Sequence, residues 1–210
     1  MRGRPDSRSI PAPVFEVLRD YLAARASFGE AELQTVRSAF LFRRLSAGEY
    51  LQRAGDVTRH AAFVARGCLR SYVIDAKGKE HIVQFAPEGW WISDLYSFLT
   101  GKAAGYFIDA LEDSDVLLID SASYEKLCTT VPKFERYFRI LLQNNYIATH
   151  RRVLASISLS AEEQYVQMLQ DFPTIVRRVA QKHIASYLGI TPEALSRIRN
   201  RIARQAQSRP

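Results

Sequence analysis

The spacing of apolar residues changes character twice along this chain. Near the N-terminus apolar residues such as Val14 and Leu18 recur every three or four positions, which predicts short amphipathic helices. From residue 40 to residue 119 the chain instead consists of short runs rich in aromatic and β-branched residues, which predict strands. Glycines separate these runs, and Lys77-Gly78 marks the clearest hairpin. This pattern predicts an antiparallel sandwich or roll, after which helical spacing returns.

Helix starts are visible in three places in the sequence. Ser27 with Glu30, and Ser160 with Glu163, have the spacing of a capping box, in which two orphan backbone amides at a helix start are satisfied reciprocally. Pro132 suits the first position of a long helix that we expect to reach about Leu154.

Within the long helix, a stripe of residues is spaced alternately by four and three positions: Phe134, Phe138, Leu141, Asn145, Ala148 and Arg152. That spacing is typical of a seam between two helices. We therefore expect residues 132–155 to form a dimerisation helix. The alternative is that the stripe packs on the β region of the same chain.

The segment QKHIASYLGITPEALSRIRN, residues 181–200, has the pattern of two short helices joined by a tight turn. Gly189 can adopt the left-handed conformation that ends the first helix. Thr191 is a good N-cap, and Pro192 suits the first position of the second helix. The segment therefore predicts a helix-turn-helix, whose second helix enters the DNA major groove.

The second of these helices has an apolar and a polar face. Leu195, Ile198 and Ile202 recur at helical spacing and form a narrow stripe for burial. The polar side chains carry the donors and acceptors that read base edges or bind phosphates. We predict that the residues contacting DNA are Thr191, Glu193, Ser196, Arg197, Asn200, Arg201 and Arg204.

The charge distribution separates a helix-turn-helix from an ordinary helix pair. Residues 172–210 hold eight Lys or Arg and one acid, Glu193, and this segment accounts for the formal net charge of +7 of the whole chain. The other residues include 21 basic and 21 acidic side chains, which cancel. Positive charge concentrated on one module indicates a phosphate backbone as partner.

Composition also excludes several classes of protein. No apolar run approaches the roughly 18 to 20 residues of a membrane helix, and the N-terminus lacks the apolar core of a signal peptide. We therefore expect a cytoplasmic protein without a membrane partner. Cys68 and Cys128 are expected to pack as ordinary side chains. Residues 1–13, rich in Arg and Pro, are expected to form a disordered arm.

Taken together, the segments resemble the Crp/Fnr family, the cyclic-AMP receptor protein and its relatives. The resemblance extends from about Val14 to Arg204 and is carried by FLFRRLSAGEYLQRAGD, FVARGCLRSYVIDAKGKEHIVQF, DALEDSDVLLID and HIASYLGITPEALSRIRNRI. It implies a β-roll sensor over residues 14–131 and a helix-turn-helix domain over residues 156–210. It also implies that Glu193 and Arg197 stand at base-reading positions.

Two departures from the family pattern change what the resemblance implies. Family members commonly end in a β-hairpin wing, and this chain stops about a dozen residues after Ile198, so we expect the wing to be absent or truncated. In members that bind cyclic nucleotides, the glutamate of a Gly-Glu pair accepts a hydrogen bond from the ribose hydroxyl, and a later Arg neutralises the phosphate. Ser93-Asp94 and Ala104-Gly105 stand at those places here.

Without the guanidinium, a bound phosphate would be buried without a partner, so we expect no cyclic-AMP binding in the usual way. The candidate effector pocket is then formed by Asp94, Lys102, Ala104 and Gly105. Lys102 either supplies a replacement cation or is an ordinary solvated lysine.

Other chemistries have weak support in the sequence. An iron–sulfur sensor would need an N-terminal cysteine group, and no cysteine precedes Cys68. Haem would depend on His60 or His81, and a lone histidine beside a strand is more often an ordinary surface residue. A cupin-like enzyme would need several converging His and Glu ligands, usually with a His-x-His pair. We therefore expect no catalytic residues, no cofactor and no metal.

The predicted fold is α+β, with an N-terminal antiparallel β-roll of the cyclic-nucleotide-binding type, flanking helices, a long dimerisation helix and a C-terminal helix-turn-helix domain without a full wing. The predicted function is that of a homodimeric, sequence-specific transcription regulator. Its expected partners are double-stranded DNA and a second copy, with RNA polymerase and an unidentified small-molecule effector as further candidates. The alternatives are a nucleotide- or small-molecule-binding regulatory module without DNA binding, and a cupin-like enzyme.

Overall fold

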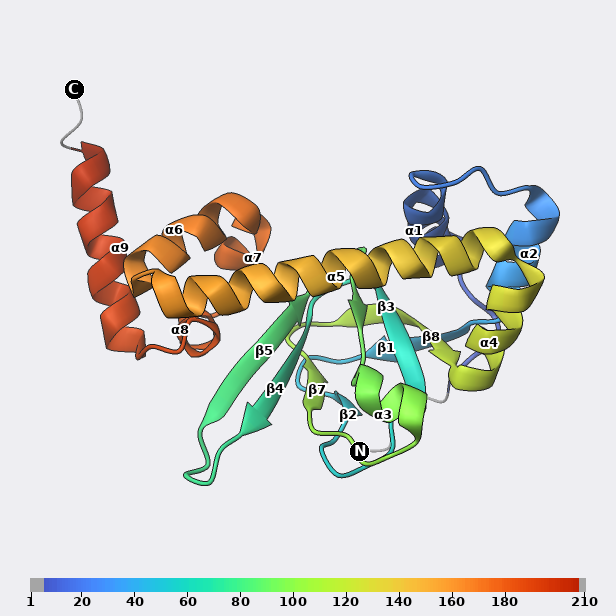
Figure 1. The fold of residues 1–210 in the computed structure, drawn as a ribbon, viewed down its shortest axis with the longest axis horizontal. Coiled ribbons are helices and arrows are strands. Elements are labelled where there is room, and N and C mark those ends of the chain that lie inside the picture. The colour runs from blue at the N-terminus through green and yellow to red at the C-terminus, as the bar shows by residue number, and fades with distance from the viewer. Residues whose placement is uncertain (1–5, 208–210) are drawn as a thin grey trace. The chain divides into compact units, whose positions relative to one another are not determined.

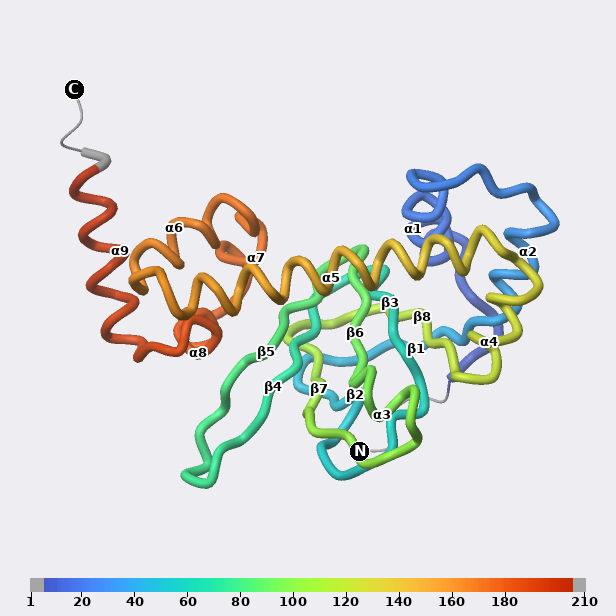
Figure 2. Tube along the Cα trace, in the orientation of Figure 1, coloured from blue at the N-terminus to red at the C-terminus, as the bar shows by residue number. Residues whose placement is uncertain are grey.

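The computed structural model describes residues 6–207 (Figure 1, Figure 2). Its helices are α1 (Ala12–Ala23), α2 (Glu30–Ser38), α3 (Leu95–Thr100), α4 (Ser121–Thr130), α5 (Pro132–Ser158), α6 (Ala161–Asp171), α7 (Pro173–Arg178), α8 (Gln181–Tyr187) and α9 (Pro192–Gln207). Its strands are β1 (Leu41–Leu45), β2 (Tyr50–Gln52), β3 (His60–Arg66), β4 (Leu69–Ile74), β5 (Glu80–Ala86), β6 (Trp91–Ile92), β7 (Phe107–Ala110) and β8 (Ser114–Asp120). This order confirms the predicted α+β fold.

The chain forms two compact units. One consists of residues up to 73 together with residues 84–144, and the other of residues 74–83 together with those from 145 onward. The division therefore falls within α5, which contributes to both units. None of the described helices is both long and apolar enough to cross a membrane. Among the same residues, no group of three or more His, Cys, Asp or Glu is placed to hold a metal ion.

Two antiparallel four-stranded sheets make up the predicted β-roll, in the orders β1-β8-β3-β6 and β2-β7-β4-β5. Side chains from both sheets meet in one apolar cluster between them, including Leu45, Val64 and Val116 from the first sheet and Leu69 and Ile108 from the second. The β4–β5 hairpin turns at Lys77-Gly78 as predicted, and Gly78 has a positive φ of 78°, which glycine adopts without steric strain.

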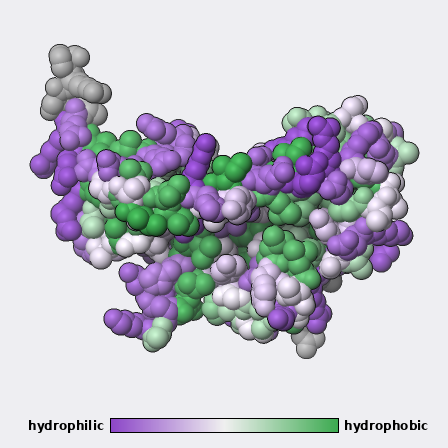
Figure 3. All heavy atoms as spheres, in the orientation of Figure 1, coloured by the Kyte–Doolittle hydropathy of each residue, from purple (hydrophilic) through white to green (hydrophobic). Residues whose placement is uncertain are grey.

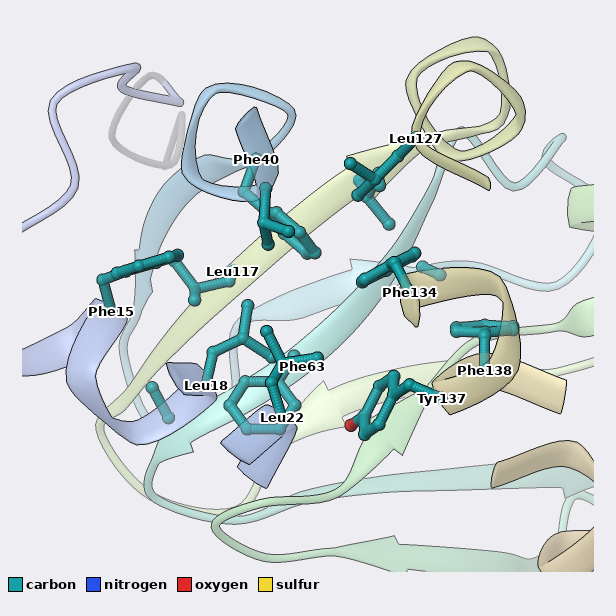
Figure 4. Close-up of a cluster of buried hydrophobic side chains, with 14 of the residues drawn as sticks. Phe15, Leu18, Leu22, Phe40, Phe63, Leu117, Leu127, Phe134, Tyr137 and Phe138 are labelled. Atoms are coloured by element: carbon teal, nitrogen blue, oxygen red, sulfur yellow. The ribbon is translucent and has the colours of Figure 1, made fainter. Parts of the chain in front are cut away.

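The other face of the first sheet is covered by helices. Successive side chains of a strand point to opposite faces, so Phe63 and Leu117 face away from the interior of the roll. They join Leu18 of α1, Leu127 of α4 and Phe134 of α5 in a second apolar cluster (Figure 4). Each of these five side chains is at most 1% exposed.

The predicted disordered arm is wrong where the structure describes it. Residues 1–5 lie outside the described residues, but Asp6 forms an ion pair with Arg43. Ser7 and Phe42 exchange backbone hydrogen bonds of 2.9 and 2.7 Å. Ile10 is buried in the helix-covered cluster. The buried Ile10, the ion pair and the backbone bridge to Phe42 thus order a segment whose composition is otherwise typical of a tail.

Only one of the two predicted capping boxes is present. Ser160 caps α6, accepting from the Glu163 amide at 3.3 Å while the Glu163 carboxylate accepts from the Ser160 amide at 2.8 Å. At α2 the box predicted from Ser27 is wrong, because the helix starts at Glu30 and the Glu32 carboxylate accepts from the Gly29 amide at 2.7 Å. Glycine is an acceptable N-cap, so Gly29 displaced the better side-chain candidate.

The predicted seam of α5 divides into two parts. Phe134 and Phe138 are 0% and 5% exposed and belong to the core of the first unit, so the alternative of packing on the β region holds for them. Asn145 and Ala148 are exposed. Arg152 belongs to the second unit and packs within it, with its guanidinium 4.4 Å from the centre of the Tyr187 ring. The large apolar side chains that α5 leaves exposed are others, namely Tyr146, Ile147, Val153, Leu154 and Ile157.

Phe134→Ala should lower the free energy of unfolding by about 3 to 5 kcal/mol, because it removes a fully buried ring and leaves a cavity. Leu99→Ala, at an apolar side chain that is 55% exposed, is the control and should change stability by less than about 0.5 kcal/mol. Urea unfolding followed by circular dichroism measures both. Equal losses in the two variants would contradict the assignment of Phe134 to the core.

Candidate nucleic-acid interface

The helix-turn-helix is present as predicted, and its local contacts explain why. Gly189 ends α8 with a φ of 70°, and the Ile190 amide donates back to the Ala185 carbonyl at 2.9 Å. Thr191 caps α9, because its hydroxyl oxygen accepts from the Ala194 amide at 3.2 Å. Each of these bonds joins residues at most five positions apart, so the turn is encoded locally.

Apolar side chains hold α8 and α9 together. Ile184 and Ala185 of α8 are 2% and 0% exposed, and Leu195 and Ile198 of α9 are 0% and 9% exposed. Ile202 is partly buried. The buried stripe therefore lies where the sequence predicted it, and it turns the polar side of α9 outward.

All seven predicted DNA-contacting residues are exposed, from Thr191 at the cap to Arg204 near the end of α9. Figure 3 shows hydrophilic residues gathered along this helix. An open hollow on α9 is lined by Arg197, Asn200, Arg201, Arg204 and Gln205. Four of these five residues belong to the predicted set, and Gln205 is an addition that the sequence did not single out. The hollow presents guanidinium and amide donors, which suit an anionic group.

Two carboxylates interact with this polar face. The pKa of Glu193 is lowered, first by a hydrogen bond from its own backbone amide and then by the Thr191 hydroxyl, with Arg197 contributing. Glu193 is therefore an ionised acceptor at the start of the helix. Glu162 of α6 forms an ion pair with Arg201, whose Nη1 lies 2.7 Å from Oε2 of the carboxylate.

A contact that sequence reasoning missed joins α8 to the β4–β5 hairpin within the second unit. The Ser186 hydroxyl donates to the Glu80 carbonyl at 2.7 Å and accepts from the Ile82 amide at 3.1 Å. It thus satisfies two backbone groups on β5, the edge strand of its sheet. More than a hundred residues separate the partners, and no local pattern signals the contact.

The structure brings the candidate effector residues together around α3, but Asp94 and Ala104 form hydrogen bonds with backbone groups of the chain itself. Asp94 is 2% exposed, and its carboxylate accepts from the Ser97 amide at 3.0 Å and from the Gly105 amide at 2.7 Å. Ala104 is buried, and its amide donates to the Asp56 carbonyl at 2.8 Å. Lys102 is exposed and lies 5.9 Å from the centre of the Tyr96 ring.

Next to this cassette are two buried hydroxyl oxygens without a hydrogen-bond partner among the described residues, Thr58 Oγ1 and Ser93 Oγ. The Thr58 amide, by contrast, donates to the Ser97 hydroxyl at 2.8 Å. Neither Thr58 nor Ser97 stood out in the sequence, because isolated hydroxyl residues in a strand-rich region carry no distinctive signal.

Comparison with known proteins agrees with this organisation. Residues 42–131 match the family described as the cyclic nucleotide-binding domain. The chain is 25% identical over 173 residues to the transcriptional regulatory protein Btr of Bordetella pertussis, a match covering 77% of this chain and 71% of that protein. It is 28% identical over 170 residues to the fumarate and nitrate reduction regulatory protein of Vibrio cholerae, covering 75% of this chain and 66% of that protein.

Among solved structures, the global regulator CLP of Xanthomonas campestris, described as responsive to c-di-GMP, superposes with a TM-score of 0.70 at 14% identity. The match covers 85% of this chain and 93% of that one, and it shows that the two share a fold. By its matched domain, its fold and its relatives, the chain is similar to transcription regulators of the Crp/Fnr type.

Proposed function

We propose that the chain is a sequence-specific DNA-binding regulator that acts in the cytoplasm as a homodimer, with α9 as its recognition helix. The observation that carries the proposal is the division of α9 into two sides. Its apolar side chains are buried against α8, while every predicted contact residue is exposed and the chain's excess positive charge lies in the same segment. A helical pair serving only as a structural support would have no need of that charge.

The side chains of α9 suit different parts of DNA. Arg197 presents a planar fork that matches the two acceptors of guanine, and Glu193, held ionised, can accept from the amino group of cytosine. Thr191 and Ser196, near the start of the helix, and Asn200 are adaptable partners. Arg201 and Arg204, toward the end of the helix, suit backbone phosphates.

The second half of α5 supports the homodimer. Tyr146 and Val153 are seven positions apart, as are Ile147 and Leu154, with Ile157 one turn further along. These five side chains are between 49% and 78% exposed in the single chain. Large apolar residues on one stretch of helix at heptad spacing are typical of a seam with an identical helix. The proposed dimer seam is therefore shifted toward the C-terminus from the stripe that the sequence suggested.

A dimer of this kind would present two α9 helices to one DNA molecule. Two-fold symmetry then requires a pseudo-palindromic site, with half-sites about one helical turn, about 34 Å, apart. RNA polymerase is the further protein partner that we propose for such a regulator. A signal received by the β-roll would change DNA affinity by shifting α5 and so the spacing of the two α9 helices.

Cyclic AMP is a poor fit for the β-roll. Asp94, the acid at the ribose-binding position, is already bound to two backbone amides, and no arginine stands at the phosphate position. Lys102 is exposed, as an ordinary solvated lysine would be. We propose that any effector is a small molecule without a phosphate, for which the unpartnered hydroxyls of Thr58 and Ser93 are suitable partners. The alternative function is a regulatory module that binds a small molecule but not DNA.

Selection of bound fragments from a random DNA pool, with and without cyclic AMP, tests the proposal. We expect enrichment of a two-fold-symmetric motif that is the same in both arms. No enrichment in either arm would favour the module without DNA binding. Enrichment only with cyclic AMP would contradict the proposed loss of nucleotide binding.

Arg197→Ala should relax the preference at one base pair of each half-site and weaken binding to the selected site by about 1 to 3 kcal/mol, because it removes a bidentate base contact. Arg204→Ala, which removes the same charge from the same helix, should weaken binding to all sequences alike and reduce the salt slope by about 1. Fluorescence anisotropy on the selected site and on single-base variants separates the two effects. An Arg197→Ala protein with the sequence preference of the parent would show that the register assigned to α9 is wrong.

Leu154→Glu should convert a dimer into a monomer, because a carboxylate placed in an apolar seam would be buried without a partner. Ile74→Glu is the matched control: Ile74 is an apolar side chain on β4 that is 46% exposed, and the variant should remain a dimer. Size-exclusion chromatography with light scattering measures the mass of each. A monomeric parent, both with and without DNA, would rule out the dimer.

Asp94→Ala should lower the free energy of unfolding by about 1 to 2 kcal/mol, because it removes a helix cap. Its loss should exceed that of Asp120→Ala at the start of α4, since Asp94 is 2% exposed and holds the distant Gly105 amide, whereas Asp120 is partly exposed and its second contact is the Ser123 hydroxyl of the same turn. Thermal unfolding with and without millimolar cyclic AMP checks both points. A rise of more than about 2 °C in the Tm of the parent on adding the nucleotide, absent from Asp94→Ala, would show that Asp94 still serves a ligand.

A further inference from the structure

We infer that Glu162 of α6 is a positioning residue for DNA binding, which holds Arg201 at the α9 hollow so that the hollow receives a phosphate of the DNA backbone. The inference rests on the proposed function and assigns a role to a residue outside the recognition helix. The contact behind this inference is the ion pair between Glu162 of α6 and Arg201, the middle one of three arginines along the hollow of α9.

The hollow is built by helical spacing. Arg197, Arg201 and Arg204 are separated by four and three positions, so they lie along one side of α9, and Asn200 and Gln205 complete the lining. Like charges at this spacing repel one another and weaken a helix. A phosphodiester group bound by Arg201 and Arg204 relieves that repulsion and accepts hydrogen bonds from both guanidinium groups.

Arg201 is restrained from outside its own helix. Its Nη1 donates to Oε2 of Glu162 at 2.7 Å, while 64% of the arginine side chain remains exposed. A guanidinium has five N–H donors, so a single carboxylate contact leaves others for a phosphate. The pair therefore orders Arg201 and leaves it able to bind DNA.

Glu162 itself is well anchored. Its side chain is 25% exposed and lies in the first turn of α6, where the positive end of the helix dipole stabilises a carboxylate. The capping box of Ser160 and Glu163 fixes that turn, and Tyr165 and Met168, each 4% exposed, hold α6 in the second unit. The acceptor for Arg201 is thus preorganised, which lowers the entropy lost when the arginine binds a phosphate.

Whether neutralising Glu162 strengthens or weakens DNA binding distinguishes a positioning role from a purely electrostatic one. Removing a carboxylate beside a DNA-binding surface adds one positive charge, and by electrostatics alone it would strengthen binding to any DNA. If Glu162 positions Arg201, the same change weakens binding, because the arginine loses its ordered conformation.

The test compares Glu162→Gln with Arg201→Ala and the double variant, all in the full chain, on DNA selected by the parent. Glu162→Gln should weaken binding about threefold to tenfold at near-physiological salt, and Arg201→Ala should weaken it as much or more while reducing the salt slope by about 1. Adding Glu162→Gln to Arg201→Ala should not weaken binding further, since the positioning effect of Glu162 acts through Arg201. Arg201→Lys should also weaken binding, because it keeps the charge and loses the planar fork.

Glu135→Gln is the matched control, because it neutralises an exposed carboxylate in the i,i+4 pair with Arg139 on α5, outside the helix-turn-helix unit. It makes the same change in net charge and should not weaken DNA binding. The inference is overturned if Glu162→Gln binds as tightly as the parent or more tightly, or if it weakens binding equally in the Arg201→Ala background. A parent that binds no DNA would overturn the proposed function as well, whereas these outcomes on a DNA-binding parent overturn only the role of Glu162.

Discussion

Phe134 and Phe138 pack the first half of α5 against the helix-covered face of the β-roll. This contact determines which apolar residues of α5 are buried and which remain exposed. Both rings lie in one aromatic cluster, with Phe138 at 5.3 Å from Trp91 and Phe134 at 6.4 Å from Phe40 between ring centres. The Trp91 indole also donates to the Tyr137 hydroxyl at 3.0 Å. These residues occupy the first turns of α5, whereas the large apolar side chains of its later turns remain exposed, and in the proposed dimer they form the seam with a second copy.

The DNA-binding unit is built from short-range and long-range contacts with different roles. Caps, the left-handed Gly189 and the buried stripe of α9 form the helix pair itself, and they act over a few residues. The Ser186 bridge to β5 and the pair between Glu162 and Arg201 connect the helix pair to neighbouring elements of its unit. In the proposed mechanism the first set defines the recognition helix, and the second restrains its orientation and its charged side chains.

The cassette around α3 shows that a retained residue type does not imply a retained role. The acid that the sequence resemblance places at a ribose-binding position is Asp94, and both of its carboxylate oxygens accept from amides of the chain itself. Such a carboxylate caps α3 and closes the loop that follows it, so its loss affects folding before it affects any ligand. The same arrangement removes the partner that a ribose hydroxyl would need.

The order of the elements, the β-roll with its hairpin turn, the capping box of α6 and the helix-turn-helix with its exposed face could all be predicted from the amino-acid sequence. Each depends on residues close together in the chain, where spacing and backbone preference act directly. Other features became visible only in the folded chain: which stripe of α5 is buried, the contacts of Asp6 and Ile10 that order the N-terminal segment, the role of Asp94 as a cap, and the distant partners of Glu162 and Ser186. Spacing along a helix or strand defines a face, but the partner that covers that face is set by chain segments tens of residues away, and no local pattern identifies it.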